Sequence, residues 1–235
     1  MLIKHFGCID AFINIILTEF IMKIAVFGAG GRIGSRIVTE ALNRGHDVTA
    51  AVRHPENYTV IHEHLKVAKA DLFNSQDVET AAFNQDAVVS AYSPAKDIPA
   101  STIKEVAIPL INGLKQAHVK RLVIVGGAGS LEVSPGLQLV DTPDFPAEYK
   151  PASLAHREAL GIYEKEKGSE LDWTFVSPSA EIYPGTRTGK FRTGDNQLLT
   201  DANGKSHISM EDYAIAIVDE IENPMHIKGH FTVGY

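Results

Sequence analysis

The chain of 235 residues is 44% hydrophobic and 22% charged, with a formal net charge of -7. This length and apolar content suit one folded domain with a sizeable core. The acidic balance disfavours a nucleic-acid-binding protein, which usually carries a basic surface, and the single cysteine, Cys8, excludes an intrachain disulfide and a cysteine metal cluster. We therefore expect a cytoplasmic protein that binds no nucleic acid, no metal and no membrane.

The first 21 residues differ from the rest of the chain. Residues 11–22 are mostly apolar, as in a signal peptide, but no small-residue cleavage site follows them. The stretch is also too short, and too often interrupted by polar residues, for a transmembrane helix. Residues 1–21 are therefore interpreted as an extension ahead of a natural start at Met22, with an amphipathic N-terminal helix as the alternative.

From Met22 onward, short apolar strands alternate with amphipathic helices, which is typical of a doubly wound parallel sheet. The predicted strands cover residues 23–27, 47–52, 65–68, 87–92, 121–125, 172–176 and 231–235. The predicted helices cover about 32–42, 75–83, 103–117 (with a kink at Pro109), 152–167 and 209–221. The sequence thus predicts a single α/β domain of Rossmann type over residues 22–235, with a small C-terminal substrate lobe around residues 180–210.

Glycines spaced three apart join the first strand to the first helix. Gly28 permits a sharp turn, Gly31 lets the backbone approach a pyrophosphate, and Gly34 allows close packing of the helix on the sheet. The N-terminus of the helix offers free N–H groups and a partial positive charge to phosphates. The sequence therefore predicts a dinucleotide site at this turn, with Arg32 and Ile33 also against the cofactor.

The end of the second strand indicates which dinucleotide is bound. A site that prefers NAD usually places an acidic residue there, on the ribose hydroxyls, but this chain has Arg53 and no acid before Glu56. A guanidinium forms a charge-assisted pair with the 2′-phosphate of NADP. We therefore expect NADP(H), with Arg32 as a second cation, and NAD(H) as the alternative.

Residues just beyond the other strands are further candidates, because ligands bind at the carboxyl ends of parallel strands. Candidate cofactor contacts are Asp71 and Leu72 near the adenine, Ala91, Tyr92 and Ser93 along the ribose and phosphates, and Gly126, Gly127 and Pro178 on the nicotinamide side. The His62-Glu63-His64 run has no visible third ligand, so it is interpreted as a solvated turn.

Several motifs together resemble those of the atypical short-chain dehydrogenase/reductases, most closely the NmrA-like and biliverdin-reductase-B-like branch, often called NADH-flavin reductase-like proteins. They are the glycine turn, Val52-Arg53, Asp71-Leu72, and residues 126–130 (GGAGS), 173–178 (WTFVSP), 184–190 (PGTRTGK) and 208–214 (ISMEDYA). The resemblance covers residues 22–235. It implies a bound nicotinamide cofactor and a reductase activity on a flat redox substrate.

One departure from the wider superfamily concerns its tyrosine and lysine pair, which protonates the substrate oxygen. Tyr163 and Lys167 have the Tyr-x-x-x-Lys spacing but fall in the last turn of their helix, so we interpret them as ordinary helix residues. Nearer the expected place, His156 occupies the slot of the lysine, while Ala152 stands where the tyrosine would be.

The missing pair constrains the reaction. An isolated ketone needs a positioned proton donor, whereas a flavin or quinone spreads the charge of hydride transfer over a conjugated ring. We therefore expect NADPH-dependent reduction of a small flavin-like or quinone-like acceptor by a monomer or homodimer, with Ser130, Tyr149 and His156 as candidates to orient the acceptor or relay a proton. The alternatives are an NADP(H)-binding redox sensor without turnover and, ranked last, a sugar-nucleotide epimerase or dehydratase.

Overall fold

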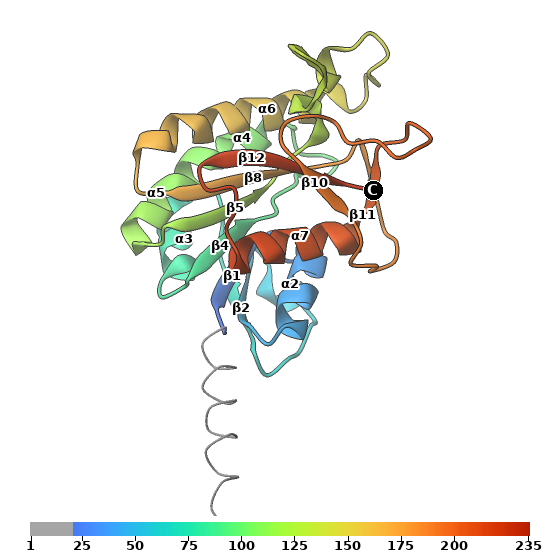
Figure 1. Cartoon of the computed structure of the whole chain (residues 1–235). Helices are drawn as coiled ribbons and strands as arrows, with labels where there is room; N and C mark the ends of the chain where they lie inside the picture. Colours follow the sequence, from blue (N-terminus) through green and yellow to red (C-terminus); the bar gives the residue numbers. More distant parts are fainter. Residues whose placement is uncertain (1–20) are drawn as a thin grey trace, which may run out of the picture.

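The computed structural model describes residues 21–235, so the interpretation of residues 1–21 as an extension falls, apart from Ile21, outside the described residues. Eight strands form one sheet in the order β10-β12-β8-β5-β4-β1-β2-β3 (Figure 1). They are β1 (Lys23–Phe27), β2 (Asp47–Val52), β3 (Leu65–Lys69), β4 (Ala87–Ser90), β5 (Arg121–Val125), β8 (Asp172–Pro178), β10 (Arg192–Gly194) and β12 (Gly229–Gly234). All neighbouring pairs are parallel except β10 with β12.

Helices cover both faces of the sheet, as the apolar strands require. One face packs on α2 (Gly34–Asn43) and α7 (Met210–Glu222), which also contact each other. The other packs on α3 (Ser75–Ala82), α4 (Thr102–Glu105), α5 (Ala107–Ala117) and α6 (Lys150–Glu164). Strands buried from both sides read as continuous apolar runs, and Trp173 of β8 is accordingly in the core, 1% exposed. The predicted doubly wound, single-domain α/β fold is confirmed.

The strand order reverses beside β1. The chain runs outward from β1 to β2 and β3, then returns to β4 on the other side of β1 and continues outward through β5, β8 and β12. Such a reversal opens a crevice at the carboxyl ends of the two central strands, where open α/β sheets bind ligands. Gly28 directly follows β1, and Ala91 directly follows β4, so both lie at this edge of the sheet.

The structure corrects the predicted helix over residues 103–117 and the end of the strand predicted over residues 87–92. The expected kinked helix over residues 103–117 is two helices that meet at Val106, and Pro109 is the third residue of α5, where its missing N–H has no partner to lose. Within the segment 180–210, β10 joins the main sheet, while β9 (Glu181–Tyr183) pairs with β11 (His207–Ser209) in a separate two-stranded sheet. Strand β4 also ends at Ser90, two residues earlier than expected.

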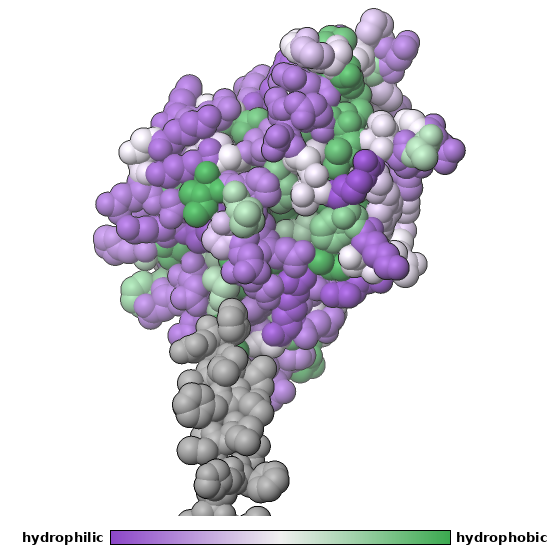
Figure 2. Space-filling model, in the orientation of Figure 1, coloured by the Kyte–Doolittle hydropathy of each residue, from purple (hydrophilic) through white to green (hydrophobic). Residues whose placement is uncertain are grey.

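A short hairpin, β6 (Glu132–Ser134) with β7 (Leu137–Gln138), follows β5 and projects from the sheet (Figure 1). Figure 2 shows that most of the surface in this view is hydrophilic, with hydrophobic side chains gathered in a band between the hairpin and the loops beside α7. No helix within residues 21–235 is long and apolar enough to cross a membrane.

Candidate functional site

The glycine turn between β1 and α2 is tightly closed. Gly28 has a φ of +76°, and a Cβ on it would lie 2.5 Å from the carbonyl oxygen of Ala91. A Cβ on Gly34 would lie 2.1 Å from the carbonyl oxygen of Gly28. Gly28 therefore serves the predicted role, whereas Gly34 is needed for closure of the turn itself rather than for packing of α2 on the sheet. Gly31 is exposed, and its amide donates to the Gly28 carbonyl at 2.9 Å.

The N-terminus of α2 is free to bind an anion. Ile33 at its N-cap offers no side-chain acceptor, and the first turn carries no acidic residue. Within residues 21–235, the backbone amides of Arg32 and Ile33 donate no hydrogen bond, and the Arg32 side chain is exposed with no ion-pair partner. Unsatisfied amides with a helix dipole behind them are what a pyrophosphate requires.

A cavity of about 280 Å³ lies at the ends of β2 and β3. It is lined by Arg53, His54, Glu56, Lys69, Ala70, Asp71 and Asp77. Because Val52 is paired with Lys69 across the two strands, Arg53 and Lys69 reach the same hollow. Two of its carboxylates are occupied with the backbone: Asp77 accepts from the Asp71 amide at 3.0 Å, and Asp71 accepts from the Phe73 amide at 3.0 Å. Leu72 is buried beneath them.

The segment after β4 lies beside the glycine turn. The Ala91 amide donates to the Phe27 carbonyl at 2.9 Å, which holds this backbone against the end of β1. Tyr92 turns toward α4, where its hydroxyl donates to Thr102 at 3.1 Å, and its ring meets Phe73 edge-on at 6.0 Å. Ser93 is exposed. Ala91 is therefore placed by its backbone, and the Tyr92 ring is turned away from the turn.

The end of β5 brings several of the predicted nicotinamide-side residues together. A Cβ on Gly126 would lie 2.2 Å from the Phe175 ring, and one on Gly127 would lie 2.9 Å from Cδ2 of His156. Because Gly127 has no side chain, the imidazole of His156 packs against the strand end. Pro178, the last residue of β8, is buried in the same layer. Ser130 is 4% exposed, and its hydroxyl has no partner within the described part of the chain.

Helix α6 supplies the other two predicted residues. Tyr149 caps its start and is 60% exposed, while His156 is seven residues further along the same face and partly buried. Burial lowers the pKa of His156 to about 4, because a charged imidazole would lose its hydration there. His156 is therefore neutral near pH 7 and cannot act as an imidazolium acid.

A second neutral histidine supports the turn after β5, and sequence reasoning missed it. The Ser177 hydroxyl donates to the Gly127 carbonyl at 2.9 Å, so its contact with Nε2 of His230 at 2.8 Å must be a hydrogen bond that the imidazole donates. Burial lowers the pKa of His230 to about 4. No local signal marks His230, since it reaches the site only through the pairing of β12 with β8.

Tyr163 and Lys167 do not assemble at this site. Tyr163 is 2% exposed, with its ring between Trp173 and Phe175 at centroid distances of 6.3 and 6.4 Å. Lys167 lies beyond α6 in the turn Lys165–Gly168, with its side chain exposed near Glu164. Burial raises the pKa of Tyr163 above its ordinary value, so the phenol stays protonated.

The sheet reversal, the glycine turn and the free N-terminus of α2 define a dinucleotide-binding protein of the Rossmann class. Residues 28–224 match the family described as NAD(P)H-binding, and the chain belongs to this family. The predicted family resemblance is thereby confirmed, and nicotinamide cofactor binding with an oxidoreductase-like fold follows from it.

Three solved structures are similar over their whole length. A protein of Burkholderia pseudomallei, described as a proposed exported protein, is 51% identical over 92% of this chain and 100% of its own, with a TM-score of 0.83. A proposed epimerase of Bacteroides thetaiotaomicron is 45% identical, with coverages of 92% and 97% and a TM-score of 0.84. A proposed NADH-flavin reductase of Streptococcus pneumoniae TIGR4 is 35% identical, with coverages of 91% and 99% and a TM-score of 0.79.

Proposed function

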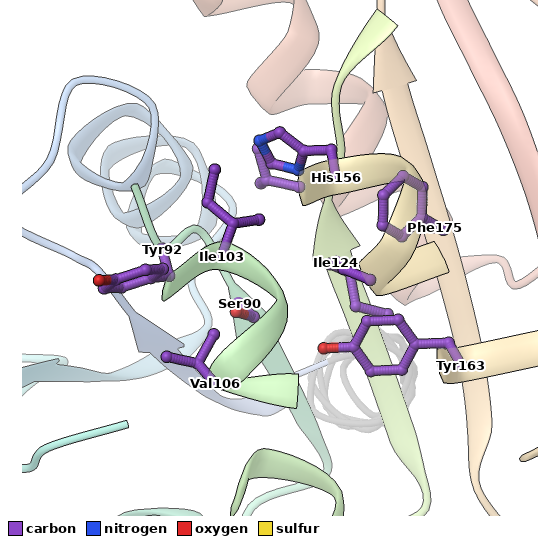
Figure 3. A pocket seen from close by; sticks show the side chains of 10 residues that line it. Ser90, Tyr92, Ile103, Val106, Ile124, His156, Tyr163 and Phe175 are labelled. Carbon is purple, nitrogen blue, oxygen red and sulfur yellow. The ribbon is translucent and has the colours of Figure 1, made fainter. Parts of the chain in front are cut away.

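We propose that the chain is an NADPH-dependent reductase that transfers a hydride to a flavin-like or quinone-like conjugated acceptor. The observation that carries this proposal is the protonation state of the nicotinamide end. Burial lowers the pKa of His156 and of His230 to about 4, so both are neutral, and the buried Tyr163 phenol, which lines the same pocket as His156 (Figure 3), stays protonated because burial raises its pKa. An acceptor that delocalises the transferred charge needs no strong acid beside it, so this environment suits a conjugated ring better than an isolated carbonyl.

The preference for NADPH rests on the hollow at the ends of β2 and β3. Arg53 and Lys69 line it at the ends of neighbouring strands, and both side chains are exposed, so they can contact a bound phosphate. The carboxylates of Asp71 and Asp77 are engaged with backbone amides. A 2′-phosphate in this hollow could pair directly with Arg53 and Lys69, although Glu56, Asp71 and Asp77 also line it. The free ribose hydroxyl of NADH gains little from either cation.

The cofactor proposal is tested by Arg53→Ala and Lys69→Ala. Each should weaken NADPH binding by about tenfold to a hundredfold, because hydrogen bonds to charged groups contribute about 1.5–3 kcal/mol. NADH binding should change by less than about twofold, since it lacks the phosphate. Lys66→Ala, an exposed lysine of β3 outside the hollow, is the control. Equal losses for the two cofactors would refute the NADPH preference.

The reaction is tested by following the loss of NADPH absorbance with FMN, riboflavin and small quinones as acceptors. We expect turnover with at least one of them. Ser130→Ala and Tyr149→Phe should raise the KM for the acceptor and leave NADPH affinity unchanged, because the proposal assigns both residues to the acceptor and not to the cofactor. Tight NADPH binding with no oxidation by any acceptor would overturn the reductase proposal.

The same assay distinguishes the proposed reductase from two other functions. The absence of a charged donor among His156, His230 and Tyr163 also suits a redox sensor that holds NADP(H) without turnover. The relative described as a proposed epimerase raises a third possibility, in which the cofactor is oxidised and reduced within one cycle. Net consumption of NADPH in step with acceptor reduction excludes both.

A further inference from the structure

The carbonyl of Arg32, in the glycine turn, is held by side chains from the first turn of α2. The guanidinium of Arg36 reaches back and donates to this carbonyl through Nη1 at 2.6 Å, and the Ser35 hydroxyl donates to it at 3.3 Å. The backbone amide of Arg36 donates elsewhere, to the Ile33 carbonyl at 3.0 Å. The side chain of Arg36 therefore fixes the direction of one peptide group at the start of α2.

The same peptide group carries the amide of Ile33. A trans peptide is planar, so its carbonyl and its N–H point in opposite directions, and no peptide bond within residues 21–235 is cis. With the Arg32 carbonyl held by the guanidinium, the Ile33 N–H points away from that side chain. Ile33 has helical dihedral angles, φ −84° and ψ −45°, and its amide donates no hydrogen bond within the described part of the chain. This N–H is therefore one of those that the start of a helix offers to a phosphate.

The guanidinium of Arg36 is itself held from α7, which packs against α2. Its Nε donates to Glu211 at 2.5 Å, and the second carboxylate oxygen of Glu211 accepts from the Gly185 amide at 2.7 Å. Although partial burial opposes the shift, the hydrogen bonds from Gly185 and Arg36 lower the pKa of Glu211, so its carboxylate is ionised near pH 7. Arg36 thus lies between two fixed acceptors, one in the glycine turn and one on α7.

Residues 185–190, here called the strap, keep Glu211 in place. Besides the bond from Gly185 to Glu211, the fully buried Asp212 accepts from the amide and the hydroxyl of Thr188, at 2.7 and 2.5 Å. A free arginine side chain has many rotamers, and it loses this freedom only where its partners are already ordered. The strap therefore supplies Arg36 with an ordered partner, 175 residues away in the sequence.

We propose that Arg36 and Glu211 are positioning residues for the pyrophosphate of the cofactor, and that the strap orders the glycine turn through this pair. Arg36 holds the peptide between residues 32 and 33 so that the Ile33 amide faces the phosphate before the cofactor binds, which lowers the cost of ordering the turn. The chain belongs to the NAD(P)H-binding family, and both NADPH and NADH carry a pyrophosphate. The inference is therefore independent of the proposed preference for NADPH and of the acceptor.

Arg36→Lys and Glu211→Gln test the pair. Lysine keeps the positive charge but lacks the planar fork that reaches both acceptors, and glutamine keeps the shape of Glu211 without its charge. Each variant should weaken the binding of NADPH and of NADH alike by about threefold to tenfold in calorimetric titration, in line with the loss of one hydrogen bond. In amide NMR, NADPH should move the Ile33 proton downfield in the wild type, and by less in both variants.

Arg187→Lys is the matched control, because Arg187 also pairs with a carboxylate across the strap and α2, at 2.8 Å from Glu40, but donates nothing to the glycine turn. Its Kd values for both cofactors should equal those of the wild type, and urea unfolding of every variant separates loss of the fold from loss of binding. Arg36→Lys serves alone if Glu211→Gln does not fold.

Two results would overturn the positioning role. Tighter binding by Glu211→Gln would show that Arg36 acts through its charge on the phosphate, since removal of the carboxylate leaves that charge unpaired. An Ile33 amide that does not respond to NADPH in the wild type, or unchanged Kd values in both variants, would refute the orientation of the turn. If Arg53→Ala weakens NADPH and NADH equally while the Arg36 and Glu211 variants behave as expected, the NADPH preference fails and the positioning role stands.

Discussion

The neutral imidazoles of His156 and His230 should make the stability of the fold depend on pH between about pH 6.5 and pH 5, mostly above the range in which carboxylates titrate. Burial lowers the pKa of His156 and of His230 to about 4, whereas an unfolded histidine titrates near 6.5. Since the folded pKa is the lower one, the unfolded chain binds protons first. The stability that each neutral imidazole contributes is complete above about pH 6.5 and is lost as the pH falls toward about 4. By about pH 5 the loss is about 2 kcal/mol for each histidine.

His230→Gln isolates one of these contributions. Glutamine keeps an N–H for the Ser177 hydroxyl but cannot bind a proton, so the variant should lose about 2 kcal/mol less than the wild type between about pH 7 and pH 5. Urea unfolding at the two pH values measures this difference. Hydrogen bonds from Arg187 and Arg44 lower the pKa of Glu40, so this carboxyl stays ionised throughout that range. His62→Gln, at an exposed histidine, is the control and should lose as much stability as the wild type between about pH 7 and pH 5. An equal loss in His230→Gln and the wild type would refute the assignment of a buried neutral imidazole.

Two further substitutions test the turn and the anchoring of residues 185–190. Gly34→Ala should abolish tight NADPH binding and lower the free energy of unfolding by about 1–3 kcal/mol, because its Cβ would lie 2.1 Å from the Gly28 carbonyl oxygen. Gly30→Ala is the control, because a Cβ there meets nothing within 4 Å. If the two variants bind NADPH equally well and unfold at the same temperature, the turn geometry is contradicted. Arg187→Ala removes two hydrogen bonds of 2.8 Å to buried Glu40 and should lower the free energy of unfolding, measured with urea, by about 1 kcal/mol. The effect is modest because the Arg187 side chain is half exposed. An unchanged free energy of unfolding would show that solvent fully replaces this ion pair.

Features that depend on residues close together in the sequence could be predicted from the sequence. Apolar runs located the central strands, because both faces of a parallel sheet are covered and each strand is continuously hydrophobic. The positive φ of Gly28 follows from a strand that must turn directly into a helix. The last helix was predicted to begin at residue 209, and the Ser209 hydroxyl caps it by accepting a hydrogen bond from the Asp212 amide at 3.0 Å.

Features that depend on which strands become neighbours could not be predicted. Lys69 joins Arg53 only because β3 pairs in register with β2, and His230 reaches Ser177 only because β12 lies beside β8. The same limit applies to Tyr163: its place in the last turn of α6 was clear, but the pocket that it lines with His156 depends on how α4, α6 and the sheet pack together. The two helices around Val106 were missed because Pro109 marks the start of a helix as readily as a kink.

The two regions that we propose for the ends of the cofactor site differ in charge and exposure. At the ends of β2 and β3, Arg53 and Lys69 are charged and exposed, so they can attract a phosphate without being desolvated beforehand. At the end of β5, the histidines are neutral because the surrounding side chains exclude water, and the same exclusion strengthens every hydrogen bond formed there. Affinity and specificity for the cofactor can therefore change at one end without disturbing the other. In the reaction that we propose, the acceptor would meet the neutral end, and its capacity to spread charge would decide whether it accepts a hydride.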